Sequence, residues 1–377
     1  MNAPEPLQQL DRNFVRWRGR KLLYFSGCDY FRLASHPAVL KATADGLRKF
    51  GLNVAASRLT SGHHKIYETL EKQLADFFGV RDALLVPTGY LTGAVAAQAL
   101  AGKYSHALVD ERAHPALQEA AHQLNCPIFK FKHRDVDDFA RAISRCGRAA
   151  RPMVLTDGMF SHFGSVAPLR AYLKSLPRNG LILVDDAHGA GVLGRTGKGA
   201  PEIENVRRRQ IIQCITLSKA FGVFGGAILG TRELRRRIFE RSRSFIGGTP
   251  LPLPLANAAL RAVEIMRADG NRLRRRLNQN AASAKAALRK AGWSIPEAPG
   301  PVIPIHTQTA SDTDGLKRHL LAAGIYPPFL NYPGGDANGY FRFAISSEHT
   351  GAQLEKLVAA LTAFKWRGQS RRKIFRR

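Results

Sequence analysis

The chain has 377 residues, 45% of them apolar, and a formal net charge of +28. This composition is typical of a globular protein of about two domains, and no stretch reaches the ~20 apolar residues that a transmembrane helix requires. Four scattered cysteines without a CxxC pair argue against a disulfide framework and a zinc site, so we expect a cytoplasmic protein without a metal centre.

Apolar strands alternate with helices through the middle of the chain. We expect strands at residues 83–86, 107–109, 153–156, 182–184, 211–215 and 225–229. This βαβ series predicts an α/β fold with a mostly parallel central sheet. The last third mixes strands at 302–305 and 341–345 with helices at 316–323 and 354–364, which indicates a smaller α+β domain.

These patterns predict four parts of the chain. They are an N-terminal arm at 1–50, a large cofactor-binding α/β domain at 51–255, a C-terminal α+β domain at 256–366 and a basic tail at 367–377. The tail follows the last apolar helical pattern, so we expect its end to be frayed.

Reactive side chains follow two neighbouring apolar strands. Asp185 and His188 come after the strand at 182–184, and Thr216 and Lys219 come after the strand at 211–215. Open α/β sheets bind their ligands at the carboxyl ends of such strands. A lysine in apolar surroundings can lose its proton and form a Schiff base with a carbonyl. The combination predicts a pyridoxal phosphate site.

Each device that this cofactor needs has a candidate. Asp185 suits the pyridine nitrogen, His188 the phenolic oxygen, and His114, at another strand end, the face of the ring. For the phosphate we expect a helix N-terminus and hydroxyl groups, supplied by Gly89, Tyr90, Ser161 and Thr216. Taken singly, each residue has a structural explanation, such as a cap, a tight turn or a surface lysine. Their joint occurrence on successive strand ends favours the cofactor.

Seven motifs resemble those of the α-oxoamine synthases, pyridoxal phosphate enzymes of the type I fold, and one of them is His133-Arg134-Asp135. They lie at 57–62, 110–114, 133–135, 156–161, 184–199, 216–222 and 342–349. The resemblance implies that Lys219 forms the Schiff base and moves the substrate Cα proton, and that Arg342 holds the amino acid carboxylate. It also implies a homodimer in which Thr249 reaches the phosphate of the neighbouring subunit.

The implied reaction is a decarboxylative condensation of a small amino acid with an acyl-CoA or acyl-carrier-protein thioester. Ser57, before Arg58, resembles the alanine-using branch, with a pimeloyl thioester as the expected donor; glycine with an acetyl thioester, or a different acyl chain, is the alternative. The chain departs from the family pattern at Cys28, at 53–56 and at Tyr67, which replace an asparagine, a glycine-rich stretch and a histidine. These departures gather on the substrate side, where Cys28 and Ser57 are expected.

The net charge suggests partners of opposite sign. Basic runs lie at 207–209, 235–237, 274–276 and 365–377. They suit a solvated surface that attracts an acidic carrier protein or a phosphate-rich thioester. Nucleic-acid binding is the less favoured alternative, because no zinc finger or aromatic RNA-binding motif accompanies the charge.

Overall fold

The computed structural model describes residues 5–331 and 339–364. Contacts divide the chain into a larger unit, His36–Phe160 with Val166–Asn271, and a smaller unit, Met1–Ser35 with Ser161–Ser165 and Arg272–Arg377. The domain bounds drawn from the sequence stay a prediction. The predicted basic tail at 367–377 lies outside the described residues.

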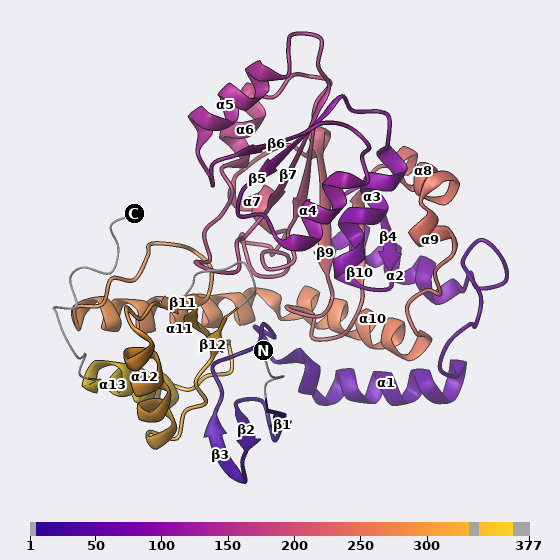
Figure 1. Ribbon diagram of the computed structural model, residues 1–377. Coiled ribbons are helices and arrows are strands. Elements are labelled where there is room, and N and C mark those ends of the chain that lie inside the picture. The colour runs from indigo at the N-terminus through magenta and orange to yellow at the C-terminus, as the bar shows by residue number, and fades with distance from the viewer. Residues whose placement is uncertain (1–4, 332–338, 365–377) are drawn as a thin grey trace. The chain divides into compact units, whose positions relative to one another are not determined.

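A seven-stranded sheet forms the centre of the larger unit, in the order β4-β10-β9-β8-β7-β5-β6 (Figure 1). Only β10 runs against its neighbours, so the predicted mostly parallel sheet is confirmed. The strands are β4 Asp82–Val86, β5 His106–Asp110, β6 Ile128–Phe131, β7 Pro152–Asp157, β8 Leu181–Asp185, β9 Ile211–Thr216 and β10 Gly226–Gly230.

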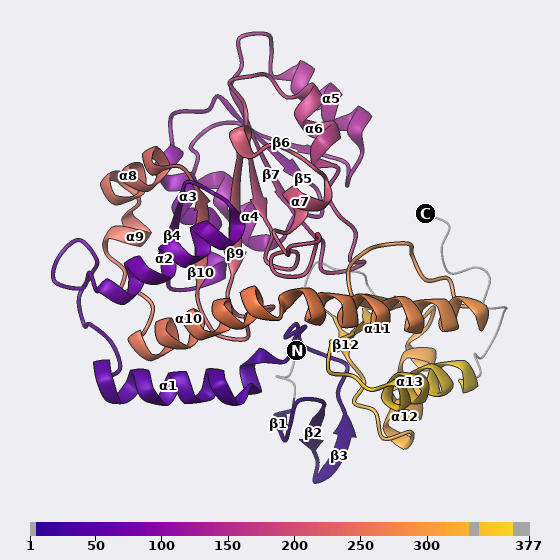
Figure 2. The same ribbon diagram turned by 180° about the vertical axis from the view of Figure 1, so that it is seen from behind.

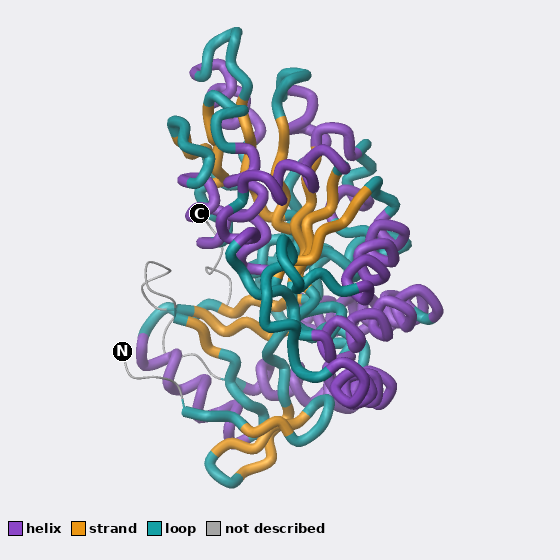
Figure 3. The backbone as a smooth tube through the Cα atoms, turned by 90° about the vertical axis from the view of Figure 1, so that its right-hand side faces the viewer, coloured by secondary structure: helices purple, strands orange, loops and turns teal. Residues whose placement is uncertain are grey.

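Helices cover both faces of this sheet (Figure 3). On one face, α3, α4, α8 and α9 share a core with alternate residues of the strands. On the other face, Phe131 of β6 meets Phe139 of α5 and Tyr172 of α6. Strands buried on both faces read as continuous apolar runs, which is why β7 and β9 were recognisable in the sequence.

The helices of the larger unit follow the strands in the expected alternation. They are α1 Pro37–Phe50, α2 Lys65–Phe78, α3 Thr92–Leu100, α4 Pro115–His122, α5 Val136–Arg145, α6 Leu169–Ser175, α7 Ala200–Ile203, α8 Arg232–Arg241, α9 Arg243–Ile246 and α10 Leu253–Ala268, with 3-10 turns η2 Gly89–Leu91 and η3 Arg208–Gln210. Helices α1 and α10 lie side by side in both ribbon views (Figures 1 and 2). Gly46 permits this approach, since a Cβ there would lie 3.0 Å from the Pro254 Cα.

The smaller unit has two three-stranded sheets. The first joins β1 Gln8–Gln9, β2 Phe14–Trp17 and β3 Arg20–Leu23, and the second joins β11 Val302–Ile305, β13 Tyr340–Ala344 and β12 Phe329–Leu330. Its helices are η1 Leu33–Ser35, α12 Ala310–Ala322, α13 Gly351–Ala363 and most of α11 Gly270–Lys290. One apolar core joins α11, α12 and α13 to the second sheet, as the mixed α+β pattern predicts.

No helix in the described parts of the chain is long and apolar enough to cross a membrane. The cysteines Cys28, Cys126, Cys146 and Cys214 are all free thiols.

Candidate active site

Three neighbouring parallel strands end in polar side chains at one edge of the large sheet. β7 ends at Asp157, β8 at Asp185 and β9 at Thr216. Asp157 pairs with Asp185 in the register of β7 and β8, and Asp185 pairs with Cys214 of β9. The sheet therefore fixes the Asp185 main chain between two hydrogen-bonded neighbours.

Lys219 lies on a tight turn between β9 and β10. The Gly222 N–H donates to the Lys219 carbonyl at 3.0 Å, and the Leu217 N–H donates to the Gly225 carbonyl at 2.9 Å. Leu217 and Phe221 on either side are buried, while Lys219 is half-buried. Among the described residues, no hydrogen bond or ion pair engages its amine. The turn thus presents a positioned amine that is available for chemistry.

His114 caps the N-terminus of α4. Its N–H donates to Asp157 Oδ2 at 2.8 Å, and its Nδ1 accepts the Ala116 N–H at 3.2 Å. A neutral ring with this contact carries its proton on Nε2. Burial lowers the pKa of His114, the nearby Lys219 adds to this effect, and Asp185 opposes it. The imidazole is therefore neutral near pH 7 and electrostatically in reach of both Lys219 and Asp185.

Gly89 brings the start of η2 against the end of β9. A Cβ at this position would lie 2.6 Å from both Cβ and Oγ1 of Thr216 and 3.2 Å from its Cα, so only glycine allows the approach. The Thr216 hydroxyl donates to the Gly225 carbonyl at 3.2 Å and accepts the Ser218 N–H at 3.1 Å. Tyr90 is exposed, and its hydroxyl donates to Glu119 at 2.9 Å. The start of η2, which leads into α3, therefore lies against the Thr216 side chain at the end of β9.

Behind Asp185, a ring of glycines encloses the carboxyl of Asp186. Cβ atoms built on Gly158, Gly189 and Gly199 would lie 2.2, 2.1 and 1.8 Å from its oxygens. Asp186 Oδ2 accepts the Ala200 N–H at 2.8 Å and the Gln213 amide at 2.6 Å, whereas Oδ1 is buried without a partner in the described residues. The Asp186 carboxyl thus connects the start of the loop that carries His188 to Ala200 and Gln213. The His188 side chain is buried as well.

Replacing Asp186 by asparagine is expected to change how stability depends on pH. Burial raises the pKa of Asp186 from 3.8 to about 7, against the hydrogen bonds from Ala200 and Gln213. A folded-state pKa above the unfolded one gives stability that is full below about pH 4 and is lost as the pH rises through 7. The whole change corresponds to a free energy on the order of 4 kcal/mol.

Asparagine does not titrate, so the Asp186→Asn variant does not lose folding stability through this group as the pH rises. Urea unfolding at pH 5 and pH 8 should show the stability of Asp186→Asn rising relative to the wild type as the pH increases. Parallel curves for the two proteins would contradict the assigned ionisation.

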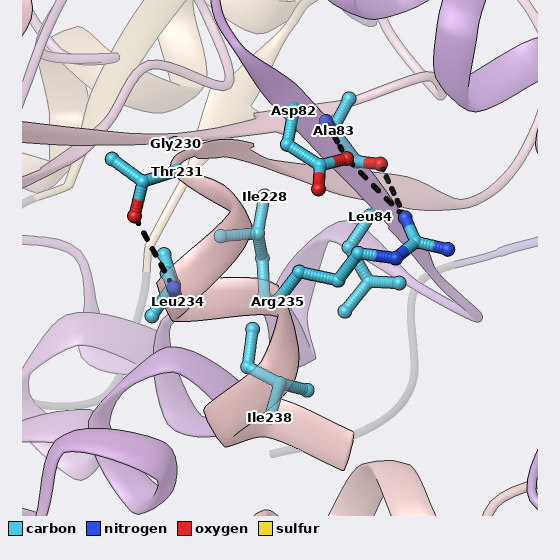
Figure 4. A pocket seen from close by; sticks show the side chains of 9 residues that line it. All are labelled: Asp82, Ala83, Leu84, Ile228, Gly230, Thr231, Leu234, Arg235 and Ile238. Carbon is cyan, nitrogen blue, oxygen red and sulfur yellow. Dashed lines mark hydrogen bonds and ion pairs between the residues drawn. The ribbon is translucent and has the colours of Figure 1, made fainter.

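A buried ion network anchors the segment that contains Ser57. Arg58 pairs with both oxygens of Glu71, whose carboxylate also accepts the Leu85 N–H at 2.9 Å and an Arg235 Nη2 bond at 2.9 Å. Arg235 Nη1 also donates to Asp82 Oδ1, at 3.4 Å, and to the Ala83 carbonyl, at 3.1 Å (Figure 4). The network ties the segment before α2 to β4 and α8. The hollow of about 10 Å³ beside Arg235 in Figure 4 has space for one water molecule, so it is no substrate site.

Two further positions of the larger unit bear on the substrate and on the expected dimer. Thr249 is exposed, just before the buried residues Pro250 and Leu251. The Tyr67 hydroxyl donates to the Leu251 carbonyl at 2.6 Å. Tyr67 therefore holds the main chain two residues after Thr249.

The smaller unit holds the remaining predicted residues. Arg342 lies on β13, and its Nη2 donates to the Cys28 sulfur at 3.5 Å. Buried His349 accepts the Ser346 N–H at 3.0 Å, and burial lowers its pKa to about 3, so it is a neutral structural histidine. Ser161 opens the segment Ser161–Ser165 of the same unit.

The larger unit thus brings together Asp185, Lys219 and His114 and, beside them, Gly89 and Thr216. The roles of these residues remain predictions. The sequence patterns did not single out Asp157, Asp186 or Glu71 as important residues. For Asp157 a signal was present, because an acid closes each of the strands β5, β7 and β8. That repeated strand-end acid is the signal that could have pointed to Asp157.

The donor set fits pyridoxal phosphate. The Lys219 amine, which no hydrogen bond or ion pair engages in the described residues, the acid Asp185 at the end of the adjacent strand and the neutral imidazole of His114 match the aldehyde, the pyridine nitrogen and the ring of that cofactor. The close approach of Gly89 to Thr216 leaves main chain and a hydroxyl side by side, which suits its phosphate.

Comparisons with known proteins identify the family and the fold of the chain. Residues 23–361 match the family model "Aminotransferase class I and II". The 8-amino-7-oxononanoate synthase of Thioalkalivibrio sulfidiphilus is 33% identical over 91% of this chain and 88% of that protein. A serine palmitoyltransferase from S. paucimobilis, solved with a bound pyridoxal phosphate–myriocin aldimine, superposes with a TM-score of 0.88 at 24% identity, covering 94% and 90% of the two chains.

A second solved structure, the 8-amino-7-oxononanoate synthase of Francisella tularensis, superposes with a TM-score of 0.78 at 22% identity, over 90% of this chain and 97% of that one. The family match covers most of the chain, and these two structures share its fold. The chain therefore belongs to the aminotransferase class I and II family, as an α-oxoamine synthase with the type I fold of pyridoxal phosphate-dependent transferases.

Proposed function

We propose that the chain condenses L-alanine with a pimeloyl thioester to give 8-amino-7-oxononanoate, CO₂ and the free thiol, a step of biotin synthesis. The observation that carries the proposal is the Lys219 amine, which has no hydrogen bond or ion pair in the part of the chain that the structure describes and lies at the same sheet edge as Asp185 and neutral His114. The names of the relatives support the choice of reaction, since several curated proteins 32–35% identical to this chain are 8-amino-7-oxononanoate synthases.

Pyridoxal phosphate, when bound, supplies an electron-withdrawing ring that stabilises negative charge at the substrate α-carbon. Asp185, as a carboxylate, would keep a proton on the pyridine nitrogen and so strengthen that withdrawal. His114 would cover one face of the ring and exclude water from it. His188 would donate to the phenolic oxygen, while Gly89, Tyr90, Ser161 and Thr216 would hold the phosphate.

Lys219 has the part of the proton carrier. Its amine, freed when the amino acid binds, would take the α-proton and later return it to the carbon that has lost CO₂. Lys219 is half-buried, and among the described residues no hydrogen bond or ion pair engages its amine, so the amine is available for this transfer. The thioester carbonyl is attacked by the α-carbon, and the thiol leaves.

Substrate recognition is assigned to Arg342, Cys28 and Ser57. The Arg342 guanidinium would pair with the carboxylate of the amino acid, a contact that two N–H groups can make in parallel. The Cys28 sulfur, 3.5 Å from Arg342 Nη2, would set how that guanidinium is presented. Exposed Thr249 would reach the phosphate in the second subunit of a homodimer, and the four free thiols are consistent with a reducing cytoplasm.

A substrate matrix tests the proposal. Purified protein with pyridoxal phosphate is assayed for CO₂ release with alanine, glycine or serine against acetyl, pimeloyl and palmitoyl thioesters. We expect the highest kcat/KM with alanine and a pimeloyl thioester, carried on coenzyme A or on a carrier protein. Turnover restricted to glycine with the acetyl donor, or to serine with the palmitoyl donor, would assign the chain to another α-oxoamine synthase reaction.

A further inference from the structure

A second acid, Asp157, lies directly beside Asp185, and the proposed reaction gives it no part. The two residues are register partners on adjacent parallel strands, and the Gly158 N–H donates to the Asp185 carbonyl at 2.7 Å. Asp157 is buried, with 5% of its surface exposed. Its carboxyl accepts the His114 N–H at 2.8 Å, and among the described residues this is its one hydrogen bond.

The nearby acid Asp110 shows what a buried charged carboxylate needs. Asp110 at the end of β5 receives three donors: the Arg112 N–H at 2.9 Å, His133 Nδ1 at 3.0 Å and the Arg134 N–H at 3.1 Å. Asp157 has a single donor and a second acid as its neighbour. A buried carboxylate with few donors next to a like charge is unfavourable and takes up a proton. In agreement, burial first and Asp185 second raise the pKa of Asp157 well above its usual range.

We propose that Asp157 is a positioning residue that acts as an uncharged carboxylic acid. It fixes the main chain of His114, and it leaves Asp185 as the charged acid of the β7–β8 pair at this edge. The use of this arrangement for pyridoxal phosphate rests on the function proposed above, whereas the protonation state of Asp157 is a property of the protein alone.

The protonation state is tested without cofactor. The imidazole of His114 is titrated by NMR in cofactor-stripped wild type and in Asp157→Asn, with His114→Gln to assign the signal. Asparagine matches an uncharged acid in shape and charge, so we expect the same His114 pKa in both proteins. If Asp157 carries a charge, its removal lowers the His114 pKa by about one pH unit or more, because a nearby anion favours the imidazolium. That result would overturn the proposal.

The positioning role is tested by the affinity for pyridoxal phosphate. Asp157→Ala removes the acceptor of the His114 N–H and is expected to raise Kd about tenfold or more, whereas Asp157→Asn keeps an oxygen there and stays near the wild type. Asp138→Ala is the matched control, since Asp138 also accepts a main-chain N–H, that of Lys132 at 2.8 Å, but lies on α5.

An Asp157→Ala protein that binds like the wild type would overturn the positioning role. Thermal melting shows whether the Asp157→Ala variant folds. If it does not fold, the His114 titration in Asp157→Asn decides whether Asp157 is uncharged. If the wild type does not bind pyridoxal phosphate at all, the proposed function is refuted. The His114 titration needs no cofactor, so it still tests whether Asp157 is uncharged.

Discussion

Lys219→Ala is expected to abolish turnover while leaving the fold unchanged. The amine is the group proposed to hold the cofactor and to move the α-proton, and proton transfer by a positioned side chain alone is worth roughly 10²–10⁴-fold in rate. The amine has no hydrogen bond or ion pair within residues 5–331 and 339–364, so its loss removes no stabilising contact. We expect kcat to fall by at least ~10²-fold and the visible absorbance band of lysine-bound pyridoxal phosphate to vanish.

The control for this experiment is Lys174→Ala. Lys174 lies exposed on α6 and takes no part in the site, so both the band and kcat should be those of the wild type. Retention of the band in Lys219→Ala would move the cofactor link to a different lysine. The proposed site would then be wrong.

Glu71→Ala is expected to be the most destabilising single change away from the site. The Glu71 carboxylate is 4% exposed and pairs with the Arg58 side chain, which is 2% exposed. Removing it leaves a buried guanidinium uncompensated and the Leu85 N–H without its acceptor. Loss of one partner of a buried pair costs about 3–5 kcal/mol. Urea denaturation should therefore show a correspondingly lower free energy of unfolding.

Two variants separate the charge from the packing. Glu71→Gln keeps an acceptor for Leu85 and should be destabilised less than the alanine variant. Glu233→Ala on α8 breaks an exposed ion pair with Arg236 and should leave stability unchanged within error. Equal stabilities of Glu71→Ala and the wild type would show that the network does not anchor the loop around Ser57.

Much of the larger unit follows from local sequence. Strands β7, β8 and β9 are continuous apolar runs because both faces are covered, and an apolar run is visible without any knowledge of its neighbours. Strand β6, Ile128–Phe131, was missed because it is short and lies at the sheet edge with a lysine inside it. The hairpin of β2 and β3 was missed for a similar reason, since arginine and lysine interrupt its apolar pattern.

The acids show the limit of sequence reasoning most clearly. Asp110, Asp157 and Asp185 all follow apolar strands, so their place at the end of a strand is readable from the chain alone. The hydrogen-bond partners and charge states of these acids are not readable from the chain alone. Asp110 gains two of its three donors, His133 and Arg134, from a turn that is distant in sequence. The Asp157 carboxyl has only the His114 N–H as a donor among the described residues, and Asp186, which follows Asp185 in the chain, is enclosed by glycines from two loops.

By itself the sequence determined the kind of fold, the strand ends that carry the acid, the imidazole and the amine, and the family resemblance that names the cofactor. These are properties of short segments, in which periodicity and residue type suffice. Only the tertiary structure decided which acid stands beside Asp185, what holds His114 and why Glu71 matters. Burial and hydrogen-bond partners decide whether a carboxyl is charged, and both arise when distant segments pack together.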